Sequence, residues 1–254
     1  MKTNSFILLL LLVSIVNNLA AQINLNTGLV AYYPFNGNAN DESGKGNNPV
    51  TNNATLTEDR FGNKNAAYRF NGESNFIQVK NSSSLCPDEL TLVAIIKPMG
   101  FYNGLCYNNT ILDKGAKDYL PGDYSLRYTA GEYTQGDCNQ ADNEHQNFVG
   151  MTSMNGGNTS QDIYVKTDTW YYVVYTFNKN HSRLYINGDL ISSNPSRGKI
   201  GKNKEDLFLG RKDNPQYPYW FNGIMDEIRI YNRALNSEEV FELYTKQSKP
   251  TSSP

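Results

Sequence analysis

The sequence predicts an all-β protein, a two-sheet antiparallel β-sandwich with one short C-terminal helix. Short β-rich segments recur along the chain and are separated by turn residues, whereas only one segment near the end has a helical pattern. The chain contains 18 tyrosines and 20 glycines, and aromatic residues favour strands whereas glycine favours tight turns. A closed β-barrel fits the same pattern and is the alternative architecture.

The expected strands are short and lie between turn-rich segments. They cover residues 28–35, 67–70, 76–79, 90–96, 111–112, 124–128, 148–151, 170–177, 183–186, 189–191, 207–209 and 223–231. The continuous apolar run 90–96 predicts a central strand that is buried on both faces. Asn71-Gly72 and Asn187-Gly188 each predict a hairpin turn between the strands that flank them.

One helix is expected close to the C-terminus. Asn236 followed three residues later by Glu239 has the pattern of a capping box. Val240, Leu243 and Tyr244 then fall on one helical face. The folded domain is therefore expected to cover residues 28–245, and the polar, Ser/Pro-rich segment 246–254 is expected to be a disordered tail.

The first 21 residues have the order of a secretory signal peptide. A short basic opening precedes the apolar run 6–16, and small residues end at Ala21. The run is too short to span a membrane, which takes about 20 residues. We therefore expect an extracellular or periplasmic protein with no membrane span in the mature chain. The formal net charge of −2 lacks the basic excess that nucleic-acid binding requires.

Three cysteines are present, and export would place them in an oxidising compartment. Cys106 and Cys138 both lie in Asn/Gly-rich loop sequence, so a disulfide between them is the favoured pairing. A disulfide between Cys86 and Cys106 is the rival, and the sequence does not choose between the two.

Four segments in order carry a resemblance to a known family. They are residues 28–44 with 46–48, residues 67–72 with 76–79, residues 170–177 through 184–188, and residues 221–235 followed by Ser237 and Glu238. Together they resemble the secreted bacterial laminin-G-like domains of the concanavalin A-like superfamily. The resemblance implies a jelly roll that binds glycans or extracellular proteins. Lectins and glucanases share the fold, which leaves function open.

The same resemblance implies a structural calcium ion. Calcium takes six to eight oxygen ligands, and the loop 36–41 is dense in such oxygens. We expect the carboxylates of Asp41 and Asp226 as ligands, with loop carbonyl oxygens near Asn36 and Asn71. The alternative is that Asp41 only forms an Asx-turn and that Asp226 only pairs with a backbone amide or an arginine.

Two aromatic-rich loops are the candidate ligand-binding surface. The first contains Tyr217, Tyr219 and Trp220, and the second contains Phe101, Tyr102 and Tyr107 around Cys106. Sugars stack their C–H faces on such rings, and exposed aromatic clusters often mark binding sites. The alternative is that these rings cap the open ends of the core.

Catalytic residues are not apparent in the sequence. Glycoside hydrolysis needs two carboxylates about 5–9 Å apart, and the adjacent Asp226 and Glu227 are expected on opposite faces of one strand. Asp142, Glu144 and His145 form a cluster that is expected to be solvated. We therefore expect a secreted, non-catalytic recognition module for glycans or extracellular protein. A divergent glycoside hydrolase or lyase and a structural or adhesive surface component are the alternatives.

Overall fold

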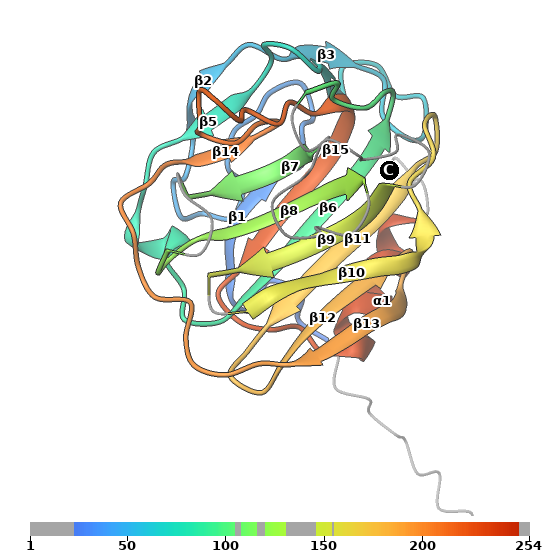
Figure 1. The fold of residues 1–254 in the computed structure, drawn as a ribbon. Helices are drawn as coiled ribbons and strands as arrows, with labels where there is room; N and C mark the ends of the chain where they lie inside the picture. The colour runs from blue at the N-terminus through green and yellow to red at the C-terminus, as the bar shows by residue number, and fades with distance from the viewer. Residues whose placement is uncertain (1–22, 105–107, 116–119, 131–145, 154, 249–254) are drawn as a thin grey trace, which may run out of the picture.

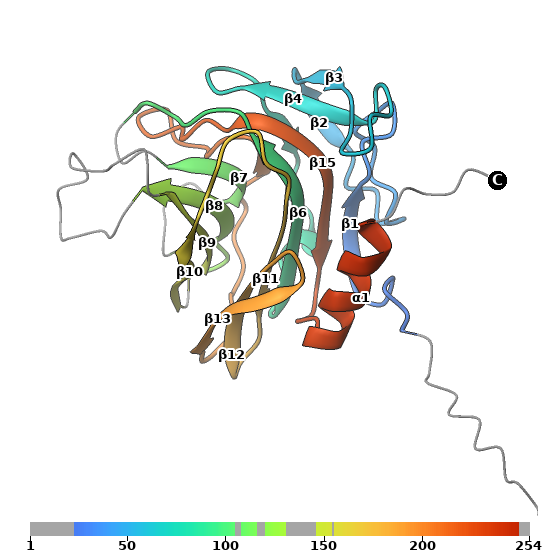
Figure 2. The ribbon, with the colours of Figure 1, turned by 90° about the vertical axis from the view of Figure 1, so that its right-hand side faces the viewer.

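The computed structural model describes residues 23–104, 108–115, 120–130, 146–153 and 155–248. Two antiparallel sheets pack face to face, and one helix covers the outer face of one of them (Figures 1 and 2). The predicted β-sandwich with a C-terminal helix is therefore confirmed, and the sheets do not close into one barrel. None of the helices in the described ranges is both long and apolar enough to cross a membrane.

Sheet A contains eight strands, with β15 paired to three neighbours. One edge of β15 pairs with β6, and the other pairs with β4 near its start and with β1 near its end. The remaining order runs β13-β12-β11-β6-β15-β4-β3. The strands are β1 (Leu29–Tyr33), β3 (Thr55–Thr57), β4 (Ala67–Asn71), β6 (Leu90–Pro98), β11 (Tyr171–Phe177), β12 (His181–Ile186), β13 (Asp189–Pro195) and β15 (Asn222–Tyr231).

Sheet B contains seven strands in the order β10-β9-β8-β7-β14-β5-β2. The strands are β2 (Pro49–Asn52), β5 (Ile77–Val79), β7 (Asn109–Lys114), β8 (Tyr124–Ala130), β9 (Gln146–Thr152), β10 (Asn155–Tyr164) and β14 (Leu207–Leu209). A single 3-10 turn, η1 (Ser83–Leu85), precedes β6.

The main core lies between the two sheets. Strand β6 shows how the sequence builds it, because alternate residues of a strand face opposite sides. Leu92 and Ala94 face sheet B and belong to the main core, whereas Val93 and Ile95 face outward. The prediction that this segment forms a central strand buried on both faces is confirmed.

A second apolar cluster lies between the outer face of sheet A and helix α1 (Ser237–Gln247). Asn236 caps the helix by accepting a hydrogen bond from the Glu239 N–H, and the Glu239 side chain accepts one from the Asn236 N–H. Val240 and Leu243 are buried against the sheet. The predicted capping box and apolar helix face are both confirmed.

The hairpin predicted at Asn71-Gly72 is wrong. Strand β4 pairs with β3 and β15 in sheet A, whereas β5 pairs with β2 and β14 in sheet B. The segment after Asn71 therefore carries the chain from one sheet to the other. The Asn187-Gly188 turn does join a hairpin, because β12 pairs with β13 and both turn residues have positive φ.

Two further differences concern element boundaries. Lys246 and Gln247, expected in a disordered tail, belong to the last turn of α1. Strands β2, β3 and β10 have no counterpart among the expected strands because their apolar alternation is weak. Residues 1–21, expected to be a signal peptide, and residues 249–254 of the expected tail lie outside the described residues.

Candidate functional site

The chain between β14 and β15 forms an arch at one end of sheet B. Its two arms bond to each other, since Lys212 N–H donates to the Pro218 carbonyl at 2.8 Å and Phe221 N–H donates to the Gly210 carbonyl at 2.9 Å. The arch also bonds to β7, because Thr110 N–H donates to the Tyr219 carbonyl at 2.9 Å. We call residues 211–221 the aromatic arch.

Arg211 organises the rings at the base of the aromatic arch. Its guanidinium carbon lies 5.2 Å from the ring centroid of Phe76 and 5.1 Å from those of Phe208 and Trp220. Asp213 holds the same guanidinium at 3.0 Å. Three aromatic side chains around one cation form a rigid cluster, because each ring face attracts the charge.

The structure brings the two predicted aromatic loops together. The Tyr102 ring meets Tyr219 edge-on at 6.3 Å, and Tyr217 lies 6.1 Å from Tyr219 on the other side. Tyr219 is buried, while Tyr217, Trp220 and Tyr102 are half-buried. Burial raises the pKa of Tyr102, so its hydroxyl stays protonated and can donate a hydrogen bond.

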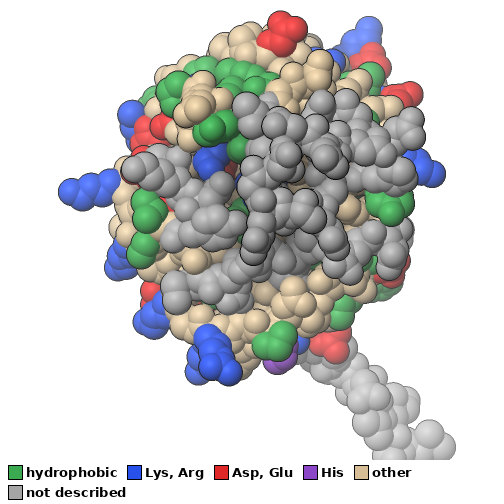
Figure 3. All heavy atoms as spheres, in the orientation of Figure 1, with side chains coloured by type: hydrophobic (Ala, Val, Ile, Leu, Met, Phe, Trp, Pro, Cys, Tyr) green, Lys and Arg blue, Asp and Glu red, His purple; other side chains and the backbone are tan. Residues whose placement is uncertain are grey.

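The two remaining predicted aromatic residues, Phe101 and Tyr107, do not join this group of rings in the described structure. Phe101 meets Tyr128 at 6.0 Å and packs against the main core, which agrees with the alternative that such rings cap the core. Tyr107 lies outside the described residues. In Figure 3 hydrophobic side chains gather over the region where Figure 1 draws β5 and β14. Hydrophobic side chains are therefore accessible at this end of sheet B.

A row of side chains continues from the aromatic arch across the outer face of sheet B. Register pairs Gln78 with Phe208, Phe208 with Asp113, and Asp113 with Ser125. Paired residues share a face, and Leu207 and Leu209 on β14 occupy the core face, so this row faces outward. Asp113 and Ser125 are at most 4% exposed, so this part of the face is closed in the structure.

Two carboxylates of this region line one small cavity. Asp113 and Asp123 both border it, together with Ser125 and Thr152. The cavity has a volume of about 10 Å³, which corresponds to a single water molecule. Asp123 accepts hydrogen bonds from Asn203 Nδ2 at 2.8 Å and from the Leu120 N–H at 3.1 Å. A sugar ring does not fit between these acids in the structure.

The four calcium ligands expected from the sequence do not form a cage. Both Asp41 oxygens already accept hydrogen bonds, Oδ1 from the N–H groups of Tyr32 and Ser43 and Oδ2 from Asn47 N–H and the Ser43 hydroxyl. These contacts include the Asx-turn that was the alternative interpretation. A carboxylate surrounded by donors has no oxygen directed at an ion.

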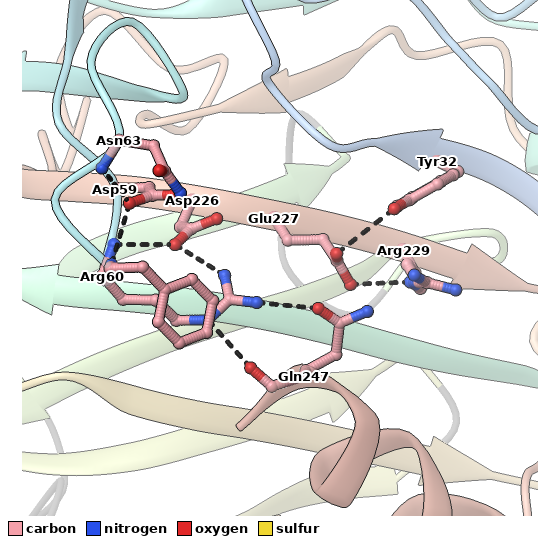
Figure 4. Close-up of polar contacts among 9 residues, drawn as sticks. Tyr32, Asp59, Arg60, Asn63, Asp226, Glu227, Arg229 and Gln247 are labelled. Carbon is pink, nitrogen blue, oxygen red and sulfur yellow. Dashed lines mark hydrogen bonds and ion pairs between the residues drawn. The ribbon is translucent and has the colours of Figure 1, made fainter. Parts of the chain in front are cut away.

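Asp226 pairs with an arginine, as the alternative also expected. Its Oδ2 lies 2.6 Å from Arg60 Nη1 and accepts a second hydrogen bond from the Arg60 backbone N–H (Figure 4). Burial raises the pKa of Asp226 above its ordinary value, although Arg60 opposes that shift. Arg60 also donates to the backbone carbonyl and the side-chain amide oxygen of Gln247 at the end of α1.

The expectation that Asp226 and Glu227 face opposite sides is wrong. A β-bulge lies between Met225 and Glu227 where β15 pairs with β6, and Met225 and Ile228 both face the main core. Both acids therefore lie on the outer face of sheet A, as Figure 4 shows. Glu227 pairs with Arg229 at 2.7 Å, so an arginine neutralises each acid separately.

The other two expected calcium ligands are engaged in local turns. Asn71 Oδ1 accepts from the backbone N–H groups of the following loop, and the Asn36 carbonyl accepts from Asn38 Nδ2. Among the described residues no three histidine, cysteine or acidic side chains gather as a metal site. The expected ligand set does not fit calcium in this arrangement, and calcium binding stays a prediction.

One of the three cysteines, Cys86, lies among the described residues. Cys86 is a free thiol, with Sγ 3.4 Å from Asn81 Oδ1 and 3.5 Å from the Asn203 carbonyl. Cys106 and Cys138 lie outside the described residues, so their disulfide stays a prediction. The cluster of Asp142, Glu144 and His145 also lies outside the described residues.

Sequence reasoning missed several residues of the candidate site. Arg211 and Phe76 stand at strand ends, where nothing in the local pattern indicates that they meet. The positions of Ser125 and Arg127 could have been predicted from the sequence. They alternate with the apolar Tyr124, Leu126 and Tyr128 along β8. That alternation indicates a polar outer face on this strand.

Similar proteins were found at the level of sequence and of structure. In sequence, the chain is 34% identical over 100 residues to the Paraclostridial mosquitocidal protein 1 of Paraclostridium bifermentans, covering 37% of this chain and 8% of that protein. It is 29% identical over 108 residues to the human adhesion G-protein coupled receptor D1, covering 35% of this chain and 12% of the receptor. The chain thus spans a small part of these relatives.

Solved structures share the fold. Domain 4 of AbnA, an extracellular GH43 arabinanase of Geobacillus stearothermophilus solved with arabinotriose, superimposes with a TM-score of 0.60 at 18% identity, covering 85% of this chain and 98% of that one. The binding domain of Paraclostridial mosquitocidal protein 1 gives 0.60 at 20% identity over 88% and 53%. Trypanosoma rangeli sialidase in complex with sialic acid gives 0.60 at 16% identity over 87% and 33%.

A family model matches most of the domain. The model describes the concanavalin A-like lectin/glucanases superfamily, in its laminin-G type, and matches residues 71–241. This range covers more than half of the chain and includes most strands of both sheets. The chain therefore belongs to the laminin-G-like group of the concanavalin A-like lectin/glucanase superfamily.

Proposed function

We propose that the chain is an exported, non-catalytic module that binds carbohydrate at the aromatic arch. The observation that carries the proposal is the cluster of Phe76, Phe208 and Trp220 around Arg211, with half-buried Tyr217 and Tyr102 beside it. Preorganised rings lose little side-chain entropy when a ligand stacks on them. Tyr102 and Arg211 add hydrogen-bond donors for hydroxyl groups at the rim.

The similar domains support this proposal without deciding it. The arabinanase domain was solved with arabinotriose, and the toxin domain is named as a binding domain. At 18% and 20% identity these likenesses concern the fold, and the ligand of this chain is a separate question. The signal-peptide pattern of residues 1–21 supports export, which is part of the same proposal.

Affinity electrophoresis with a panel of soluble polysaccharides, together with a glycan array, tests the proposal. We expect Trp220→Ala and Tyr217→Ala each to weaken binding by about tenfold, since each removes one stacking ring. Phe241→Ala is the matched control, because Phe241 is 58% exposed on helix α1, away from the arch. If no glycan is retained, or if the arch variants bind as well as the Phe241 variant, the proposal is wrong.

A glycoside hydrolase is the second candidate, and one observation favours it. Asp113 and Asp123 line the same cavity, and a hydrolase needs two such acids. The cavity has room for about one water molecule, so catalysis would require the site to open. Release of reducing sugar from the same polysaccharide panel, lost on Asp113→Asn, would establish this candidate in place of the binding module.

A further inference from the structure

Lys114, the last residue of β7, is a lysine that the fold buries completely. Its exposed fraction is 0%. Burial lowers the pKa of Lys114 below its ordinary value, although Cys86, Asp123 and Glu205 oppose that shift. An uncharged amine is a nucleophile, and burial is one way in which proteins prepare a lysine to form a covalent bond.

The amine of Lys114 meets the side-chain amide of an asparagine. Lys114 Nζ donates a hydrogen bond to Oδ1 of Asn203, which lies in the segment between β13 and β14, 89 positions further along the chain. The backbone N–H of Glu205 donates to the same oxygen at 3.2 Å. The amine nitrogen therefore lies beside the carbonyl carbon Cγ, and a second donor is placed to stabilise negative charge on Oδ1.

A carboxylate holds the nitrogen of the same amide. Asn203 Nδ2 donates to Asp123 Oδ1 at 2.8 Å, and the N–H of Leu120 donates to Asp123 Oδ2 at 3.1 Å. Asp123 is buried and borders the cavity of about 10 Å³, which has room for one molecule of the size of water or ammonia. Asp123 thus touches the nitrogen that would leave if the amine attacked Cγ.

Two glycines allow the three segments to approach this closely. A β-carbon on Gly115 would lie 2.5 Å from Asp123 Cγ, and one on Gly122 would lie 2.4 Å from the backbone nitrogen of Asn203. The Gly122 N–H also donates to the Ile200 carbonyl at 2.7 Å. Backbone packing therefore holds the amine, the amide and the carboxylate together, and such positioning accelerates a reaction between neighbouring groups.

A second lysine close to the same segment shows a different arrangement. Lys80 Nζ lies 2.9 Å from Asp206 Oδ2, and the same oxygen accepts a hydrogen bond from Gln78 Nε2 at 2.7 Å. The Lys80 side chain is 65% exposed, and its amine contacts the carboxylate. At Lys114 the amine is buried and contacts the amide, which is the order that amide exchange requires.

We propose that Lys114 and Asn203 join in an intramolecular isopeptide bond, with Asp123 as the proton carrier. The lone pair of Lys114 Nζ forms a bond to Asn203 Cγ, and the Cγ–Nδ2 bond breaks with its electron pair on the nitrogen. Asp123 takes one proton from the attacking amine and passes it to Nδ2, which leaves as ammonia. The reaction consumes neither an oxidant nor water, and Asp123 is regenerated. This modification does not depend on carbohydrate binding at the aromatic arch.

Peptide mapping of the purified, reduced chain by mass spectrometry tests the proposal. An isopeptide bond prevents trypsin from cleaving after Lys114, so the digest contains a branched peptide in which residues 81–117 are linked to Asn203-Lys204. The mass of this peptide is that of its two parts joined with the loss of one ammonia. The assignment is overturned if the digest contains the unbranched peptide 81–114 and no branched product.

Three variants check the role of each group. Lys114→Arg keeps a cation but removes the nucleophile, so no branched peptide forms. Asp123→Asn keeps the shape of the side chain but removes the proton carrier, and the branched fraction then grows about 100-fold more slowly after purification. Asp206→Asn is the matched control, because Asp206 contacts Lys80, and it keeps the branched peptide. Bond formation at an unchanged rate in Asp123→Asn would contradict the proposed proton transfer.

Discussion

At the scale of single residues, one glycine allows a tyrosine of helix α1 to pack against the β12–β13 turn. Gly188 has a φ of +88°, a left-handed conformation that costs other residues energy. A β-carbon there would also lie 2.7 Å from Tyr244 Cδ1. Two effects therefore act on the same position, backbone strain and a clash with the ring.

Gly188→Ala is expected to destabilise the fold by about 1–3 kcal/mol, which is the usual size of local strain plus overpacking. Gly46→Ala is the matched control, because Gly46 has a φ of +75° and no atom within 4 Å of the added carbon. Urea unfolding of the two variants separates the effects. Equal losses would mean that the Tyr244 ring moves away without cost.

At the scale of elements, helix α1 is fastened to the sheet by charge as well as by apolar packing. Glu239 accepts hydrogen bonds from both Nη atoms of Arg233, at 2.9 and 2.8 Å, and from the Asn236 N–H. Burial alone would raise the pKa of Glu239, but these donors outweigh it and hold the pKa below its ordinary value. The ionised form is therefore favoured in the folded chain.

A lowered carboxyl pKa makes this contribution depend on pH. It is present above the unfolded pKa of about 4.3 and is lost as pH falls through the lower folded value. Glu239→Gln keeps an acceptor for the cap but removes the charge, so we expect a loss of about 0.5–1 kcal/mol at neutral pH. Urea unfolding at pH 7 and near pH 3 should show that the difference vanishes in acid. A difference that persists in acid would assign the loss to packing.

At the scale of the whole molecule, sheet A is the middle of three layers, between sheet B and helix α1. Sheet A contributes to the main core on one face and to the helix cluster on the other, and the aromatic arch lies at the end of sheet B, away from α1.

Calcium is also a question for the whole molecule, because the expected ligands come from distant parts of the chain. Both oxygens of Asp41 accept hydrogen bonds from protein donors, and Asp226 Oδ2 is held by Arg60, so we expect EDTA to leave the melting temperature unchanged. An ion that bound only the folded state would raise it. An increase in melting temperature on adding calcium to the chelated protein would instead support the ligands expected from the sequence.

Local patterns were sufficient for most strands and for the helix. The alternation in β6, the Asn187-Gly188 turn and the capping box at Asn236 each involve neighbours in sequence, so their geometry follows from local rules. The hairpin predicted at Asn71-Gly72 was wrong because the same turn residues also occur where the chain crosses from one sheet to the other. The prediction that Asp226 and Glu227 face opposite sides failed because of the bulge before Glu227. One extra residue shifts the alternation of faces, and nothing in the composition indicates it.

The sequence by itself determined the family, the sandwich, the capped helix and the presence of two aromatic loops, because period-two alternation, turn residues and ordered motifs are properties of neighbouring residues. Only the tertiary structure decided which groups meet. It placed Tyr102 beside Tyr219, surrounded Arg211 with three rings, and paired Asp226 with Arg60 across 166 positions of the chain. Such contacts depend on strand order and register, which are set by packing of the whole chain and not by local pattern.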